Sequence, residues 1–168
     1  LAAAGIPQIS YASTSPALSD ATAYPDFFRI VPSDAFQGAA LADMVAASGV
    51  SNPALIHMTN TYGAGLADSF EGYWTDAGHS LCLKAGYADT DTDFTAQVQA
   101  VIDSGCDSAV LASYSADGAM IVETMAVMGA TVPTFGADGI AGESALNDYS
   151  NPAAANGIQV TYPRACLL

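Results

Sequence analysis

Residues that could hold a small dipolar molecule are spread over separate stretches of this 168-residue chain. The hydroxyls and backbone amides of Ser13–Ser15 can bind a carboxylate without help from a cation. A lone acid, Asp138, is suited to an ammonium group, and the rings of Tyr62 and Tyr114 can enclose an amino group and an aliphatic stem. These residue types together predict a site for a zwitterion. The candidate ligand-binding residues are Ser13, Thr14, Tyr62, Tyr114, Asp138 and Gly139.

Catalytic and metal chemistry find little support in the sequence. The run Asp89–Asp93 begins like a calcium loop, but Phe94 stands where the loop needs Gly and Ala100 where it needs Glu, so we expect a solvated loop and no metal site. There is no G-x-S-x-G motif. His57 falls inside an expected strand and His79 at a helix-to-strand turn, so neither is placed to activate a nucleophile. We therefore expect a protein that is not an enzyme.

One enzymatic alternative remains open. Gly63-Ala64-Gly65 follows an expected strand and begins a helix, as a dinucleotide-binding turn does, and Asp89 ends the next strand where a ribose-binding acid would lie. The third glycine of that motif is replaced by Asp68, a poor neighbour for a pyrophosphate. The rival hypothesis is thus a nucleotide-binding oxidoreductase domain.

The elements that must position these residues alternate between apolar strands and helices that nearly all end at glycine. This alternation predicts an α/β fold, a three-layer parallel sheet with helices on both faces of a Rossmann-like kind. Ligands bind such sheets at the carboxyl ends of the strands, where the candidate residues fall. Within Ser33–Gln37 we expect Asp34 to cap a helix and Gln37 to complete the capping box. The expected strands are 7–10, 27–31, 54–58, 81–87, 108–112, 134–135 and 158–162. The expected helices are the one that Asp34 caps and Gly49 ends, followed by 64–77, 94–102, 118–128 and 143–148.

Composition narrows the possible partners. Apolar residues make up 51% of the chain, whereas Lys and Arg number 3 against 17 Asp and Glu, which gives a net charge of −14. Such acidity disfavours nucleic acids and anionic lipid surfaces, and no stretch predicts membrane insertion or a signal peptide. Three cysteines are too few for a zinc site, and a bridge between Cys82 and Cys106 is one open possibility beside free buried thiols.

An ordered set of motifs resembles the branched-chain amino-acid (leucine/isoleucine/valine) binding proteins of ABC importers, which are type I periplasmic binding proteins. That family has two α/β lobes joined by three hinge crossings. The resemblance implies that residues 1–32 form the end of the first lobe and a hinge crossing, and that residues 33–165 form the second lobe. The motifs are ISYASTSPALS at 9–19, FR at 28–29, SDAFQG at 33–38, TYGAGLA at 61–67, DF at 93–94, CDSAV at 106–110 and FGADG at 135–139.

The resemblance also implies a role for each candidate residue. Ser13 contacts the ligand through its backbone, Thr14 holds the ligand carboxylate, Tyr62 and Tyr114 line the cleft, and Asp138 takes the α-ammonium. Branched-chain binders carry Glu at this last position, so the shorter Asp leaves the choice of solute open.

The implied function is the solute-binding receptor of an ABC importer, located in the periplasm. Its partners are an amino acid or similar small polar solute and the ABC permease, and it carries no cofactor. A ligand-sensing regulatory domain on the same fold is a further alternative. Because half of the cleft would lie outside the chain, we also expect weak solute binding and self-association.

Overall fold

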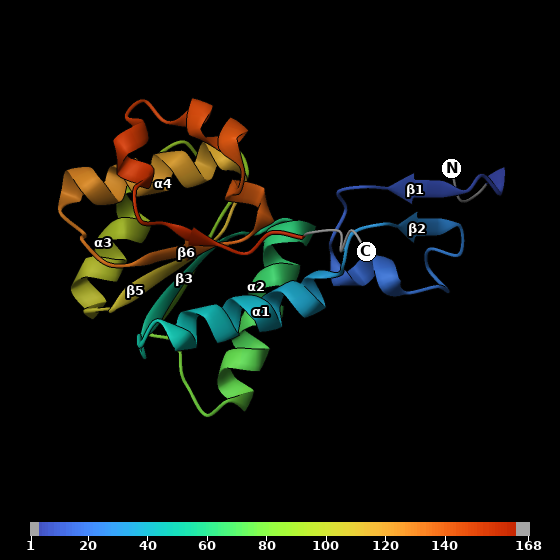
Figure 1. Ribbon diagram of the computed structural model, residues 1–168, viewed down its shortest axis with the longest axis horizontal. Helices are drawn as coiled ribbons and strands as arrows, with labels where there is room; N and C mark the ends of the chain where they lie inside the picture. Colours follow the sequence, from blue (N-terminus) through green and yellow to red (C-terminus); the bar gives the residue numbers. More distant parts are fainter. Residues whose placement is uncertain (1–3, 164–168) are drawn as a thin grey trace, which may run out of the picture.

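The computed structural model describes residues 4–163, which form a five-stranded parallel sheet covered by helices and a separate two-stranded parallel sheet (Figure 1). The strands are β1 (Gln8–Ser10), β2 (Phe27–Arg29), β3 (Pro53–Met58), β4 (Leu83–Tyr87), β5 (Ser108–Ala112), β6 (Thr134–Gly136) and β7 (Gln159–Val160). The α-helices are α1 (Asp34–Ala47), α2 (Thr61–Asp76), α3 (Thr95–Ser104) and α4 (Ser115–Met128). The 3-10 helices are η2 (Pro16–Ser19), η3 (Asp138–Ile140), η4 (Glu143–Asp148) and η5 (Pro152–Ala155).

The larger sheet has the strand order β4-β3-β5-β6-β7, with every pair parallel. From β3 the chain first runs to β4 on one side and then returns to β5 on the other. Parallel sheets of this order bind ligands where the direction of winding reverses, at the carboxyl ends of the central strands. Here that point lies between Met58, which pairs with Tyr87 of β4, and Ala112, which pairs with His57 of β3. The expected fold class is confirmed.

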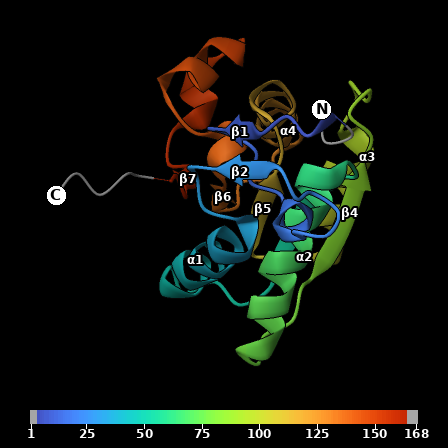
Figure 2. The same cartoon turned by 90° about the vertical axis from the view of Figure 1, so that its right-hand side faces the viewer.

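Two apolar layers cover the sheet, and Figure 2 shows α1 and α2 on one side of it with α3 and α4 on the other. Residues of β3 alternate between the layers because successive strand side chains point to opposite faces. Leu55 packs toward α1 and α2, whereas Ile56 packs toward α3 and α4. The first layer centres on Leu41, Val45, Leu66, Phe70 and Trp74, and the second on Phe94, Val98, Val101, Ile121 and Met125.

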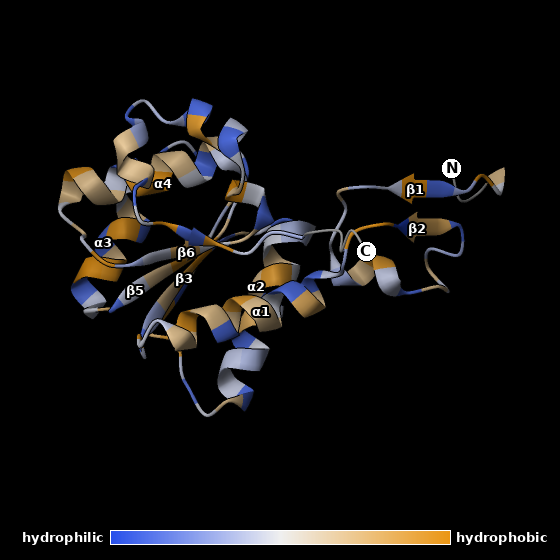
Figure 3. Cartoon of the chain, viewed as in Figure 1, coloured by the Kyte–Doolittle hydropathy of each residue, from blue (hydrophilic) through white to orange (hydrophobic). Residues whose placement is uncertain are grey.

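Strands β1 and β2 form a small parallel ribbon that extends from the body of the molecule (Figure 1). Ile9 lies directly beside Phe28 in this ribbon, and both side chains are more than half exposed. Figure 3 shows hydrophobic colouring on β1 and β2, outside the main body. The division into residues 1–32 and 33–165 stays a prediction, and the last two residues of that range lie outside the described part of the chain.

The start of α1 corrects one expectation from the sequence. Ser33, not Asp34, is the N-cap, and its hydroxyl accepts a hydrogen bond from the Ala35 amide at 3.3 Å. Asp34 is instead the first helical residue and is fully buried. Gln37 does not complete a capping box, because its side-chain amide donates to the backbone oxygen and hydroxyl of Thr161.

Other helix boundaries differ by a few residues for local reasons. Helix α2 begins at Thr61, three residues earlier than expected, because the Asn60 side chain caps it by accepting from the Gly63 amide at 2.9 Å. The expected helix over 143–148 is a 3-10 helix, and the last expected strand shrinks to Gln159–Val160. Helices α3 and α4 end at left-handed glycines, as expected from the sequence.

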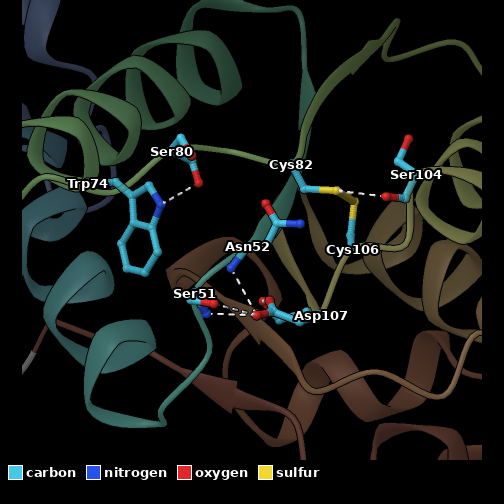
Figure 4. Close-up of a disulfide and its surroundings, with 9 residues drawn as sticks. Ser51, Asn52, Trp74, Ser80, Cys82, Ser104, Cys106 and Asp107 are labelled. Carbon is cyan, nitrogen blue, oxygen red and sulfur yellow. Dashed lines mark hydrogen bonds between the residues drawn. A yellow bond between two sulfur atoms is a disulfide. The ribbon is translucent and has the colours of Figure 1, made fainter.

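The strand ends opposite the candidate site are held by a disulfide. Cys82 and Cys106 are bridged, which settles a question that the sequence left open (Figure 4). Beside it, the Asp107 carboxylate accepts hydrogen bonds from the amides of Ser51 and Asn52 at 2.7 and 2.9 Å (Figure 4). These bonds fix the entries of β3 and β5, and they keep the pKa of Asp107 low despite its partial burial. The third cysteine, Cys166, lies outside the described residues.

Candidate functional site

A cleft of about 550 Å³ opens between the carboxyl ends of β3, β5 and β6 and the loop that follows β1. Its volume is within the usual range for small-molecule sites. All six residues proposed from the sequence line it, although they come from separate parts of the chain. The lining residues are Ala12, Ser13, Thr14, Ser15, Leu18, Tyr24, Thr61, Tyr62, Tyr114, Asp138 and Gly139.

The Ser13–Ser15 loop contributes hydrogen-bond donors to the cleft. The Ser10 hydroxyl accepts the Ser13 amide at 2.9 Å and donates to the Ser13 hydroxyl at 2.8 Å, so the loop turns tightly after β1. Thr14 is only 2% exposed, and its hydroxyl makes no hydrogen bond with the described residues. A buried polar group without a partner is costly unless a ligand or water satisfies it. The Thr14 hydroxyl lies near enough to the Asp34 carboxyl to lower the pKa of that acid, but it forms no hydrogen bond of good geometry there, so it can turn to an oxygen of a bound molecule.

Two tyrosines form the aromatic wall of the cleft. The rings of Tyr62 and Tyr114 stack with centroids 5.0 Å apart and planes inclined by 6°. The Tyr62 hydroxyl donates to Oδ1 of Asp138 at 3.0 Å and accepts from the Gly139 amide at 3.1 Å. Burial and the Asp138 charge raise the Tyr62 pKa, so this hydroxyl keeps its proton. The Tyr62 hydroxyl thus fixes the orientation of the Asp138 carboxylate.

Gly139 is required by the close approach of its neighbours. A Cβ atom at this position would lie 2.3 Å from the Ser113 carbonyl oxygen and 2.7 Å from the Tyr62 hydroxyl. Both distances are shorter than non-bonded contacts allow, so a larger residue would displace the turn that carries Asp138.

Near the acidic end of the cleft is a buried acid, Asp34, which was not among the residues proposed from the sequence and does not line the cleft itself. Asp34 is fully buried, and neither of its carboxylate oxygens has a hydrogen-bond partner among the described residues. Burial raises the pKa of Asp34 to about 7, and the charge of Asp138 acts in the same direction, whereas the Thr14 hydroxyl and Arg29 lower it. Burial also raises the pKa of Asp138, despite its bond from Tyr62. A buried acid and a half-buried acid whose charges repel one another favour the binding of a cationic group.

Asp34 was missed because the sequence offered it a simpler role. Ser33 and Asp34 are both good N-caps, and only one can occupy that position in α1. The sequence did contain one signal: two good N-cap residues stand next to each other before a single helix. Whichever residue does not cap the helix is free to take another role. The influence of Asp138 on the Asp34 pKa depends on the tertiary structure, which the sequence does not reveal.

The residues behind the alternative chemistries have structural roles. A Cβ at Gly63 would lie 2.4 Å from the Met58 carbonyl oxygen, and one at Gly65 would lie 3.0 Å from Pro16, so packing accounts for both glycines. Asp68 forms an ion pair with Lys84 at 2.8 Å. His57 Nδ1 lies 2.8 Å from the Met58 carbonyl oxygen. Within residues 4–163 there is no group of three residues suited to a metal ion.

The fold and cleft define a ligand-binding lobe of the type I periplasmic binding protein class. A leucine-binding protein from Thermotoga maritima superposes with a TM-score of 0.80 at 22% identity, over 88% of this chain and 42% of its own. A protein assigned to a branched-chain amino acid ABC transporter of Rhodospirillum rubrum superposes with a TM-score of 0.77 at 20% identity, over 93% of this chain and 44% of its own. These likenesses establish the fold.

The chain belongs to the receptor family ligand binding region, whose model matches residues 1–162. Its curated relatives include metabotropic glutamate receptor 6 of rabbit, 42% identical over 78 residues, and human metabotropic glutamate receptor 8, 45% identical over 65 residues. The match with the rabbit receptor covers 46% of this chain and 9% of the receptor, and that with the human receptor 39% and 7%. The resemblance seen in the sequence is confirmed at the level of family and fold. In the described residues no helix is long and apolar enough to cross a bilayer.

Proposed function

We propose that this chain forms part of a receptor that captures a free amino acid in the cleft between two lobes, without chemical change. The observation that carries the proposal is the composition of one cleft. The unpartnered Thr14 hydroxyl is at one side, and the Asp138 carboxylate lines the same cleft from a different element. A zwitterion needs hydrogen-bond donors for its carboxylate and an anion for its ammonium, and both are supplied here.

The ammonium end is the more strongly defined. Asp138, held by Tyr62, and the buried Asp34 offer negative charge that is not matched by a cation on the cleft wall. An ammonium group between them would relieve the unfavourable burial of two like charges. The stacked faces of Tyr62 and Tyr114 suit the carbon stem beside that ammonium. Asp34 therefore joins Asp138 as a proposed ammonium ligand.

Uptake through an ABC importer is the proposed use of this capture, with a permease as partner and the periplasm as compartment. The structural likeness to proteins of that class supports it, as does the Cys82–Cys106 bridge, since disulfides persist outside the reducing cytosol. Ligand sensing is the second candidate, favoured by the 42% identity to metabotropic glutamate receptor 6 over 78 residues. A nucleotide-binding oxidoreductase has less support, since packing explains Gly63 and Gly65.

Calorimetry on the complete gene product tests the capture of an amino acid. The protein is titrated with each of the twenty proteinogenic L-amino acids and, separately, with NAD. We expect one or more amino acids to bind and NAD not to bind. Asp138→Asn should weaken the tightest amino acid by about 30-fold, the cost of one lost charged hydrogen bond. The matched control is Asp43→Asn, an exposed acid of α1 away from the cleft.

The carboxylate end is tested in the same way. Thr14→Val should weaken the amino acid by about tenfold or more, and Thr131→Val, at an exposed threonine outside the cleft, should not. Binding of NAD that is lost in Gly65→Val, with no amino acid bound, would instead favour the oxidoreductase. Reconstitution with the permease in proteoliposomes separates the two outputs, because an importer receptor stimulates uptake and ATP hydrolysis and a sensor does neither.

A further inference from the structure

Arg29, the last residue of β2, contacts the Ser13–Ser15 loop through its guanidinium group. Its Nη1 donates to the carbonyl oxygens of Thr14 at 2.9 Å and Ser15 at 2.8 Å, and reaches that of Ser13 at 3.5 Å. Its Nη2 donates to the Ser19 hydroxyl. One guanidinium therefore gathers three consecutive carbonyl groups.

The direction of these carbonyls fixes the direction of the amides. In a trans peptide the C=O of one residue and the N–H of the next point in opposite directions, and the described chain has no cis peptide bond. Because the carbonyls of Ser13 and Thr14 point toward Arg29, the amides of Thr14 and Ser15 point away from it. Neither amide donates to any described residue. Consecutive free amides that point the same way form a concavity for an anion.

A second bond locks the same peptide. The Asp34 amide donates to the Thr14 carbonyl oxygen at 2.9 Å, so this oxygen is shared between Arg29 and the first residue of α1. Within residues 4–163 no carboxylate lies within 4.0 Å of the guanidinium. Its positive charge is therefore not cancelled by a contact ion pair, and it lies behind the loop that would hold the anion.

We propose that Arg29 is a positioning residue for the ligand carboxylate: it holds the carbonyls of Ser13, Thr14 and Ser15 toward its own guanidinium so that the Thr14 and Ser15 amides face the cleft. The inference rests on the proposed function, because it assumes that the ligand carries a carboxylate. Arg29 does not line the cleft, and it acts through the loop. The guanidinium fork is needed because several acceptors must be held at once, which an ammonium group cannot do in one fixed geometry.

The experiment compares Arg29→Gln and Arg29→Lys with the wild-type protein in the complete gene product. The control is Lys84→Gln, which removes one positive charge from an ion-paired residue of β4 far from the loop. The ligands are the tightest amino acid of the twenty tested above and its α-carboxamide, which keeps the ammonium but lacks the anion. Amide hydrogen exchange at Ser13 and Asp34 is measured in the same proteins without ligand.

Both Arg29 variants should weaken the amino acid by about 30-fold and the carboxamide by less than about threefold, so that selectivity for the carboxylate collapses. Exchange at Ser13 and Asp34 should accelerate at least about tenfold in Arg29→Gln and stay unchanged in Lys84→Gln. If Arg29→Lys keeps the wild-type preference for the amino acid over its carboxamide, the forked shape of the guanidinium is not required. That result would overturn this part of the proposal, because a positive charge alone would be sufficient.

Two other results would overturn the proposal. If the amino acid and its carboxamide weaken equally, Arg29 supports the fold and not the carboxylate site. If amide hydrogen exchange at Ser13 and Asp34 is unchanged in Arg29→Gln, Arg29 does not hold the loop, and this conclusion is independent of the ligand-binding results. Failure of the wild-type protein to bind any amino acid would sink the proposed function and the carboxylate role with it, while the exchange data would still decide whether Arg29 orders the loop.

Discussion

Asp34 and Asp138 lie close enough in space for the charge of Asp138 to raise the pKa of Asp34, although one residue begins α1 and the other begins η3 after β6. Asp34 is fully buried and Asp138 is half-buried at the cleft, and no cationic side chain lines that cleft. The pair is therefore unfavourable when both acids are ionised and no ligand is present.

Asp34→Asn should stabilise the protein at high pH. The Asp34 pKa is raised from 3.8 to about 7, so the folded state holds a proton that the unfolded state releases above about pH 4. The stability that this proton supplies is complete below the unfolded pKa and is lost as pH rises through 7. We expect the free energy of unfolding of the variant, measured in urea, to exceed that of the wild type by about 4 kcal/mol at pH 8 and by little at pH 4. An equal effect at both pH values would contradict the assignment.

Ligand affinity should rise with pH. A bound ammonium favours the ionised form of Asp34, so binding must release the proton that this residue carries below pH 7. We expect the dissociation constant of the tightest amino acid to fall by about tenfold between pH 6 and pH 8. Titrations in two buffers of different ionisation enthalpy count the released proton. In Asp34→Asn both the pH dependence and the proton release should vanish.

Gly139→Ala should damage the site and the fold together. The new methyl group would clash with the Ser113 carbonyl oxygen and the Tyr62 hydroxyl, so the turn that carries Asp138 must move. We expect a loss of about 1–3 kcal/mol in unfolding free energy and weaker amino-acid binding. The control is Gly72→Ala in α2, where a Cβ meets nothing within 4 Å, and which should be neutral or slightly stabilising.

Loss of the Cys82–Cys106 bridge should lower the stability of the fold without weakening ligand binding in the cleft. The bridge links residues 24 apart in sequence at the strand ends away from the site, and a crosslink of this length restricts the unfolded chain by about 3 kcal/mol. We expect the double variant Cys82→Ser/Cys106→Ser to melt at lower temperature than wild type. Its affinity for the amino acid, measured well below that temperature, should remain unchanged.

The isolated chain should self-associate through the β1–β2 ribbon. Ile9 is 72% exposed and Ile30 is 78% exposed, beside Phe28 at 56%. Such a cluster of exposed apolar side chains favours association. Light scattering should show a mass that rises with concentration, and Ile9→Ser/Ile30→Ser should reduce it. Val127→Ser is the control, because Val127 is 87% exposed on α4, away from the ribbon.

Local patterns in the sequence were enough to predict most of the elements. Strand β5 has the predicted bounds, because an apolar run between turn residues leaves little choice of conformation. The ends of α3 and α4 follow from Gly105 and Gly129, since these glycines adopt a left-handed backbone conformation at little cost. The start of α2 was less predictable, because the Asn60 cap depends on one side-chain hydrogen bond.

The sequence was enough to predict residues that line the cleft, but not the burial and pKa of the acids near it. Residues such as Thr14 and Asp138 could be grouped from sequence because parallel strands deliver their carboxyl ends to one edge, and the structure places both on one cleft. Their role in ligand binding stays a prediction. Only the tertiary structure decided that Asp34 is a buried acid beside Asp138, that Arg29 grips the loop behind Thr14, and that Cys82 meets Cys106. The physical reason is that helix and strand preferences are set by near neighbours, whereas burial, pKa and long-range contacts depend on which distant segments the folded chain brings together.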